Sequence, residues 1–123
     1  MKKRRFKTGA VRDVDTDKFD FGEYFSPLAY ARFAIHMRKS AKKYGAGNWR
    51  KGIPQQEALK SKRRHAWQVD MAEYGVVIEP ETDHLASEMF NIMIKMHEEE
   101  LEKIKKLKPG DNLYGYEFGG LKK

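Results

Sequence analysis

The segment from Lys43 to Gly52 combines basic, amide and aromatic side chains among glycines. Lys43 and Lys51 can neutralise phosphate oxygens. Asn48 can hydrogen bond to the edge of a base or a ribose, and Trp49 can stack on a purine ring. A Trp in a Gly-rich loop can also be a hydrophobic plug, and lysines beside a loop can simply be solvated. The chain has neither a Walker-type phosphate loop nor a Gly-x-Gly-x-x-Gly motif. The side-chain chemistry alone therefore predicts a loop that holds a phosphate and an aromatic base.

Two histidines belong to a second group of residues suited to chemistry. His65 shares one face of a predicted helix with small and apolar residues, which would turn its ring inward. Arg64 and His65 on that helix could converge across a pocket with Asp83 and His84, which stand at the start of the next helix. A buried cluster of ionisable groups needs a ligand or a metal to offset its desolvation. A core histidine satisfied by one hydrogen bond is the alternative for His65.

The last predicted helix carries a polar row with helical spacing, formed by His84, Glu88, Asn91 and Lys95. Such a row could hold a divalent cation. Carboxylate and amide oxygens suit Mg²⁺ or Mn²⁺, while imidazole favours transition metals, so the mixture indicates one of these two ions. The apolar residues of the same helix lie largely on its other side, so a solvated helix face explains the row equally well.

Three amphipathic helices are predicted to position these residues. Ser26-Pro27 indicates the start of the first, because Ser can accept a bond from an unpaired backbone N–H and Pro suits the first turn. This helix should run to about residue 44, where glycines end it. The second should span residues 55–73, and the third residues 83–107 with Thr82 or Asp83 as its cap. Between them, residues 76–80 are expected to be extended, with a short strand as one option.

The elements predict an all-α fold in a single domain, a small helical bundle of three main helices with N- and C-terminal arms. Residues 1–25 are expected to form an ordered arm, because their several aromatic side chains would be costly to leave in water. Residues 26–107 form the helical core, and residues 108–123 a tail that packs over a groove or a neighbouring subunit. So few helices make a thin core. Oligomerisation to a dimer or tetramer is therefore expected to complete the bundle.

The composition narrows the classes of function without choosing one. Cysteine is absent, so disulfides and thiolate metal sites are excluded. The apolar runs are too short to cross a membrane, and the basic start lacks the apolar stretch of a secretory signal, so a cytoplasmic protein is expected. A net charge of +7 suits polyphosphate or nucleic acid. A basic helical nucleic-acid-binding protein is therefore an alternative. The basic residues that suggest it are Arg50, Lys51, Lys60, Lys62, Arg63 and Arg64.

Several short blocks in order give the sequence a family resemblance. They are Thr8-Gly9-Ala10-Val11-Arg12-Asp13, Ser26-Pro27-Leu28-Ala29, Ala41-Lys42-Lys43-Tyr44-Gly45, Asn48-Trp49, Lys51-Gly52-Ile53-Pro54, Arg64-His65 and Asp83-His84-Leu85-Ala86, continuing to Asn91. From Thr8 to about Glu100 the chain resembles the dATP/dGTP diphosphohydrolases of phages and bacteria, which are related to the all-helical MazG-like nucleoside triphosphate pyrophosphohydrolases. For a phage-encoded member the cytoplasm would be that of the host.

The resemblance implies cleavage between the α and β phosphates of dGTP or dATP, giving the monophosphate and pyrophosphate, with Mg²⁺ or Mn²⁺. In this sequence the residues around the metal or its water would be Asp83, His84, Glu88 and His65, with Asn91 orienting them. Phosphates would be held by Arg64, Lys43 and Lys51, and the purine by Asn48 and Trp49. The MazG-like group shows Glu-x-x-Glu on one helix and Glu-x-x-Asp on another, whereas this chain offers Glu88 with Asn91, and His65. A family member that binds nucleotide without hydrolysing it is a further alternative.

Overall fold

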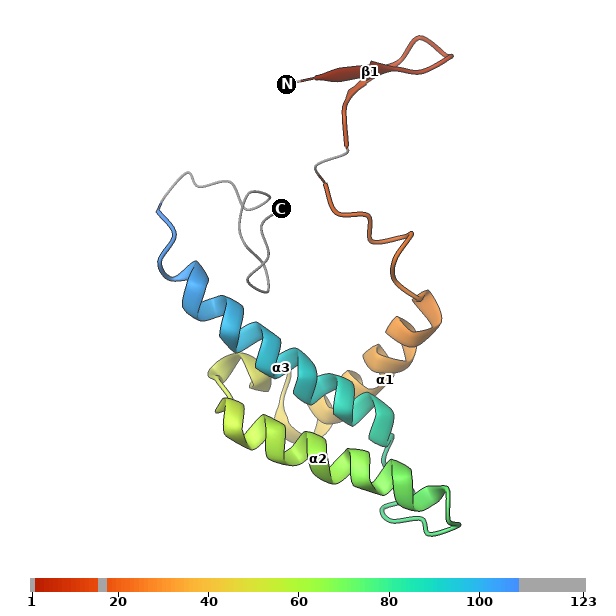
Figure 1. The fold of residues 1–123 in the computed structure, drawn as a ribbon, viewed down its shortest axis with the longest axis vertical. Helices are drawn as coiled ribbons and strands as arrows, with labels where there is room; N and C mark the ends of the chain where they lie inside the picture. Colours follow the sequence, from red (N-terminus) through yellow and green to blue (C-terminus); the bar gives the residue numbers. More distant parts are fainter. Residues whose placement is uncertain (1, 16–17, 109–123) are drawn as a thin grey trace.

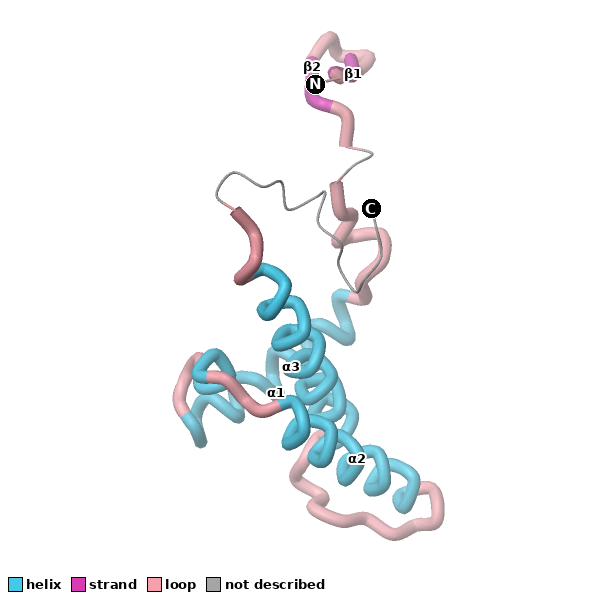
Figure 2. Tube along the Cα trace, turned by 60° about the vertical axis from the view of Figure 1, so that its left-hand side comes forward, coloured by secondary structure: helices cyan, strands magenta, loops and turns pink. Residues whose placement is uncertain are grey.

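Two antiparallel helices form the centre of the molecule, whose computed structural model describes residues 2–15 and 18–108. Helix α2 (Gln55–Ala72) and helix α3 (His84–Ile104) lie side by side in both views (Figures 1 and 2). The buried apolar residues of the described chain are Ala58 on α2 and Ala86 and Ile94 on α3. Small side chains allow the two helices to approach closely. The same seam also buries polar residues, namely Gln68, Ser87 and Asn91.

Helix α1 (Pro27–Tyr44) contacts mainly α3 and is held more loosely. Its start is the predicted one, because the backbone N–H of Ala29 donates to Ser26 Oγ at 3.1 Å. It ends at Gly45, whose φ of 93° is unfavourable for other residues. None of its residues is buried. Its amphipathic character is only partly confirmed: of the apolar and aromatic residues at helical spacing, Phe33, Met37 and Ala41 are half-buried, whereas Tyr30, Ala34 and Tyr44 are exposed.

A short 3₁₀ helix, η1 (Asn48–Lys51), shapes the loop between α1 and α2. Gly47 precedes it in the left-handed conformation, with φ of 72°. Trp49 packs edge-on against His97 of α3, with 5.0 Å between ring centroids. The Arg50 guanidinium lies 5.2 Å from the Trp49 ring centroid. The loop is therefore fixed against α3 by its tryptophan.

The N-terminal arm contains regular structure that the sequence did not indicate. Strands β1 (Lys3–Arg5) and β2 (Val11–Asp13) pair antiparallel, with Arg4 opposite Arg12. This hairpin lies apart from the helices (Figure 1). Its strands are short and mostly charged, so the alternation of apolar and polar residues that marks a strand is missing.

The predicted fold class is confirmed: the structure is a small all-α bundle with three long helices among the described residues. Each helix boundary falls within three residues of its prediction. The option of a strand at residues 76–80 is wrong, because bends and turns occupy this stretch of the described chain. The predicted C-terminal tail lies almost entirely outside the described residues. Among the described helices, none has the length and apolar character needed to cross a membrane.

Candidate functional site

A polar cleft of about 700 Å³ opens between α1, the start of α3 and the loop that precedes α3. Its lining contains basic, acidic and hydroxyl-bearing side chains. The basic residues are Arg32, Lys39 and Lys43, the acidic ones Glu79, Glu81 and Asp83, and the histidines His36 and His65. Ser40, Ser61, Thr82, Ser87 and Asn91 add neutral hydrogen-bonding groups. The basic side chains of this polar cleft come from α1, and the acidic ones come from the loop before α3 and the residue that caps it.

A second hollow, the aromatic pocket, adjoins the polar cleft at the loop after α1. It has a volume of about 480 Å³ and is mostly apolar. Tyr44 and Phe90 line both hollows, as does Ser40. Trp49 and Asn48 line only the aromatic pocket within the described chain. The two hollows are therefore neighbours whose linings share three residues.

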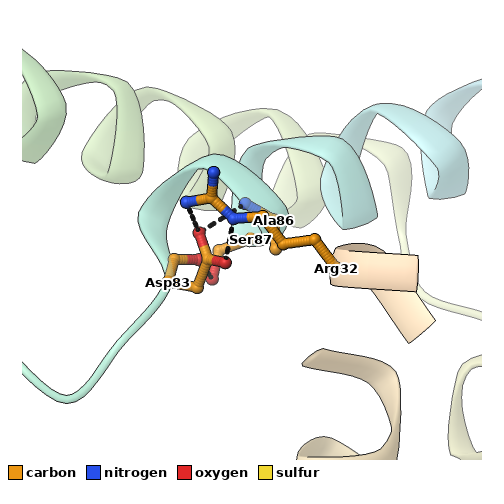
Figure 3. A network of polar contacts seen from close by, with 4 residues as sticks. All are labelled: Arg32, Asp83, Ala86 and Ser87. Carbon is orange, nitrogen blue, oxygen red and sulfur yellow. Dashed lines mark hydrogen bonds and ion pairs between the residues drawn. The ribbon is translucent and has the colours of Figure 1, made fainter. Parts of the chain in front are cut away.

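Arg32 and Asp83 form a two-pronged ion pair at the mouth of the polar cleft (Figure 3). Arg32 Nε donates to Asp83 Oδ2 at 2.6 Å, and Arg32 Nη2 donates to Asp83 Oδ1 at 2.8 Å. The Ala86 N–H also donates to Asp83 Oδ1, so Asp83 caps α3 as predicted. The hydrogen bond from Arg32 lowers the pKa of Asp83, and the pair raises the pKa of Arg32. Asp83 thus ties α1 to the start of α3.

His65 lines the polar cleft and contacts His84, which is not part of the cleft lining in the described structure. Their Nδ1 atoms lie 2.8 Å apart, and His84 Nε2 lies 2.8 Å from the carbonyl oxygen of Ile78. Burial is the main cause of a lowered pKa for His65, and the nearby His84 adds to it. Arg64, the other half of the predicted pair, is exposed and does not line the cleft in the described structure.

The loop before α3 places Glu79 at the cleft in an unusual backbone conformation. Glu79 has φ of 52°, which is uncommon for a residue with a side chain. Gln68 Nε2 donates to Glu79 Oε1 at 3.2 Å and so holds the acid from the side of α2. Gln68 Oε1 is the only buried side-chain oxygen or nitrogen of the described residues without a hydrogen bond. An outlier of this kind beside a cleft is a reason to suspect a functional role.

Asn91 joins α2 to α3 beneath the polar cleft. It is buried, and its Nδ2 donates to Ser61 Oγ at 3.2 Å and to the Ser87 carbonyl at 2.9 Å. These partners are two serines that also line the cleft, and none of the predicted metal-site residues is among them, so the orienting role of Asn91 stays a prediction.

The residues predicted to bind a metal do not converge in this structure. Asp83 faces Arg32, both ring nitrogens of His84 have partners, and Glu88 does not line the cleft in the described part of the chain. Within residues 2–15 and 18–108, no three His, Asp or Glu side chains are grouped so that they could hold a metal. The assignment of these ligands stays a prediction, and the arrangement seen here does not fit a cation held by the protein alone.

The predicted phosphate-binding lysines are separated. Lys43 lines the polar cleft, whereas Lys51 is exposed on η1 and lines neither hollow in the described structure. Sequence reasoning missed Arg32, His36 and Lys39, which line the cleft with Lys43. Their spacing along α1 is that of one helix face, so the row could have been found by the pattern used for apolar stripes. No sequence pattern marked Glu79 as a cleft residue, because its position depends on the backbone conformation of the loop.

Comparison with known proteins gives one match. The family model described as dATP/dGTP diphosphohydrolase, N-terminal, matches residues 8–107, which are 100 of the 123 residues. The chain therefore belongs to this family. No similar protein was found among curated proteins or among solved structures.

Proposed function

We propose that this member of the dATP/dGTP diphosphohydrolase family binds a purine deoxynucleoside triphosphate across both hollows and hydrolyses it to the monophosphate and pyrophosphate. The observation that carries the proposal is that the polar cleft and the aromatic pocket adjoin, with three lining residues in common. The triphosphate would lie in the cleft along the basic row of α1, and the purine would lie in the pocket. The family match supports a nucleotide substrate.

The basic row of α1 is the part suited to the phosphates. Arg32, Lys39 and Lys43 present positive charge on one face of the helix, and His36 lies between them. These groups can bind phosphate oxygens and offset the charge that develops on the departing pyrophosphate. Arg32 would bind a phosphate oxygen either while it stays paired with Asp83 or after it leaves Asp83 for the phosphate.

The aromatic pocket is the part suited to the base. Trp49 and Tyr44 offer flat faces, and the rim residue Asn48 offers both a donor and an acceptor to a base edge. A purine covers more of such a surface than a pyrimidine does. We therefore propose a preference for dGTP and dATP.

We also propose that hydrolysis depends on Mg²⁺ or Mn²⁺, and that the cation arrives bound to the triphosphate. Mg²⁺ in phosphate sites is held by substrate oxygens and only one or two protein carboxylates. Glu79 and Glu81 line the polar cleft and are suited to this use. A cation that arrives on the triphosphate does not require the three-residue group that is missing from the described chain.

Two matched pairs of variants test the placement of the substrate. Lys43→Ala should raise KM for dGTP by about tenfold, the loss expected from one charge-assisted contact of ~1.5 kcal/mol. Lys42→Ala should leave KM unchanged, because Lys42 is exposed and lines neither hollow in the described structure. Trp49→Ala should weaken dGTP binding by a similar factor, whereas Trp67→Ala on α2 should not. Equal effects within either pair would contradict the placement.

We also propose that the chain forms a homo-oligomer, because the core of a single copy is small. Helix α3 exposes an apolar stripe of Leu85, Met89, Ile92 and Met96, each at least 40% exposed. Association would bury this stripe. Sedimentation equilibrium at micromolar concentration should give a dimer or tetramer, and a Met89→Lys variant should shift it toward monomer. A wild-type monomer at that concentration would remove this part of the proposal.

Nucleic-acid binding is the competing function, and an observation supports keeping it. The basic residues predicted for this role on α2 and η1 are mostly exposed, outside both hollows. Their use would give a DNA affinity that falls steeply with salt. Weak binding with little dependence on salt would exclude this function and leave the nucleotide site unaffected.

A further inference from the structure

A line of hydrogen-bonding groups runs from the loop before α3 into the polar cleft. The carbonyl oxygen of Ile78 lies 2.8 Å from His84 Nε2. His84 Nδ1 lies 2.8 Å from His65 Nδ1. His65 lines the cleft, and its Nε2 makes no hydrogen bond within the described residues. Gln68 Oε1 is the only buried side-chain nitrogen or oxygen without a hydrogen bond among the described residues, so His65 Nε2 contacts solvent.

The protons of this line can be placed from its chemistry. A carbonyl oxygen only accepts, so His84 Nε2 carries a proton and donates it to Ile78. Neutral His84 then has its lone pair on Nδ1. Two Nδ1 atoms at 2.8 Å must share one proton, which therefore belongs to His65 Nδ1. Neutral His65 is left with its lone pair on Nε2, the nitrogen that is open to the cleft.

We propose that the Ile78 carbonyl, acting through His84, holds His65 in the tautomer with a free Nε2 lone pair, and that this nitrogen accepts the proton of the attacking water. This inference rests on the proposed function. The water oxygen bonds to the α phosphorus, the bond from that phosphorus to the α–β bridging oxygen breaks, and pyrophosphate leaves with the electron pair. The water proton moves to His65 Nε2. His84 is a positioning residue, because it acts through His65.

The charges around His65 favour this use. Burial lowers its pKa, as do His84 on α3, Arg64 on α2 and His36 on α1, while Glu79 of the loop opposes them. Burial and these neighbours therefore favour the neutral ring, whose lone pair can accept a proton from water.

Nitrogen-15 NMR of the imidazole rings tests the tautomers without any substrate. The chain has 4 histidines, so single substitutions assign every ring. In the neutral protein His65 should show a protonated Nδ1 and an unprotonated Nε2, and His84 should show the reverse. A neutral His65 that carries its proton on Nε2 would overturn the inference.

Kinetics test the consequence for catalysis. His65→Gln should lower kcat for dGTP by about 100-fold, the lower range for loss of a general base. His84→Phe should lower kcat by about tenfold with KM nearly unchanged, since His65 then spends part of its time in the wrong tautomer. In this variant the NMR signal of His65 Nε2 must also move toward the protonated form. A purely structural role for His84 would lower stability and leave that signal in place, which would overturn the positioning role.

These experiments distinguish a failure of the His65 inference from a failure of the proposed hydrolase function. Hydrolysis of dGTP by a protein whose His65 Nε2 is protonated rejects this inference and leaves the proposed function intact. The assigned tautomers in a protein that hydrolyses no triphosphate reject the proposed function and, with it, the base role of His65. If His84→Phe does not fold, the tautomers of the wild-type protein decide the inference alone.

Discussion

The pair α2/α3 and the helix α1 are held in place in different ways. The first two helices bury Ile94, two alanines and a hydrogen-bonded asparagine between them. Helix α1 buries none of its residues and is joined to α3 by the exposed ion pair of Arg32 with Asp83. The histidine pair is built on the firmly packed side of the polar cleft, whereas the basic row is on the loosely packed side. A site of this kind can keep the histidine pair in place while the proposed phosphate-binding wall on α1 adjusts to a ligand.

The largest expected effect comes from substituting an isoleucine in each of the two regions, the α2/α3 pair and α1. Ile94→Ala should lower the free energy of unfolding by about 2–5 kcal/mol, because the side chain is fully buried. Ile35→Ala on α1 should cost less than about 1 kcal/mol, since Ile35 is 48% exposed. Urea unfolding measures both. Similar losses would show that α1 contributes as much burial as the central pair, and the contrast would be wrong.

Variants of Asp83 give the next largest effect and separate its two tasks. Asp83→Ser keeps a capping oxygen for the Ala86 N–H but loses the ion pair, whereas Asp83→Ala loses both. The alanine variant should be less stable than the serine variant by about 1 kcal/mol. Arg32→Gln should speed amide hydrogen exchange in α1 and leave exchange in α2 and α3 unchanged. Faster exchange throughout the molecule would mean that the ion pair supports the whole bundle.

The smallest effect is a dependence of stability on pH. His65 has a pKa below its ordinary 6.5, so its contribution is complete above pH 6.5 and is lost as the pH falls through the lowered value. Asp83 has a pKa below its ordinary 3.8, so its contribution is complete above that pH and is lost at still lower pH. Urea midpoints should therefore fall in two steps on acidification. Burial also lowers the pKa of His36, which contributes to the step at higher pH. His65→Gln should therefore reduce that step, and a curve unchanged by the substitution would contradict the assignment.

The sequence predicted local features well and long-range ones poorly. The helix starts were predictable because Ser26 and Asp83 are capping residues directly before apolar periodic segments. The meeting of His65 with His84 was predictable because both face the seam of neighbouring helices. The ion pair of Arg32 with Asp83 joins residues 51 positions apart, and no local pattern encodes it. The backbone of Glu79 is likewise set by packing of its loop, so the sequence suggested an extended stretch instead.

The most direct test of the central claim is the identity of the products. Phosphorus-31 NMR can follow dGTP incubated with the full-length protein and Mg²⁺ or Mn²⁺. We expect dGMP and pyrophosphate in equal amounts, with dATP hydrolysed as well and pyrimidine triphosphates hydrolysed more slowly. Production of dGDP with orthophosphate, of deoxyguanosine with triphosphate, or no turnover with any nucleotide would contradict it.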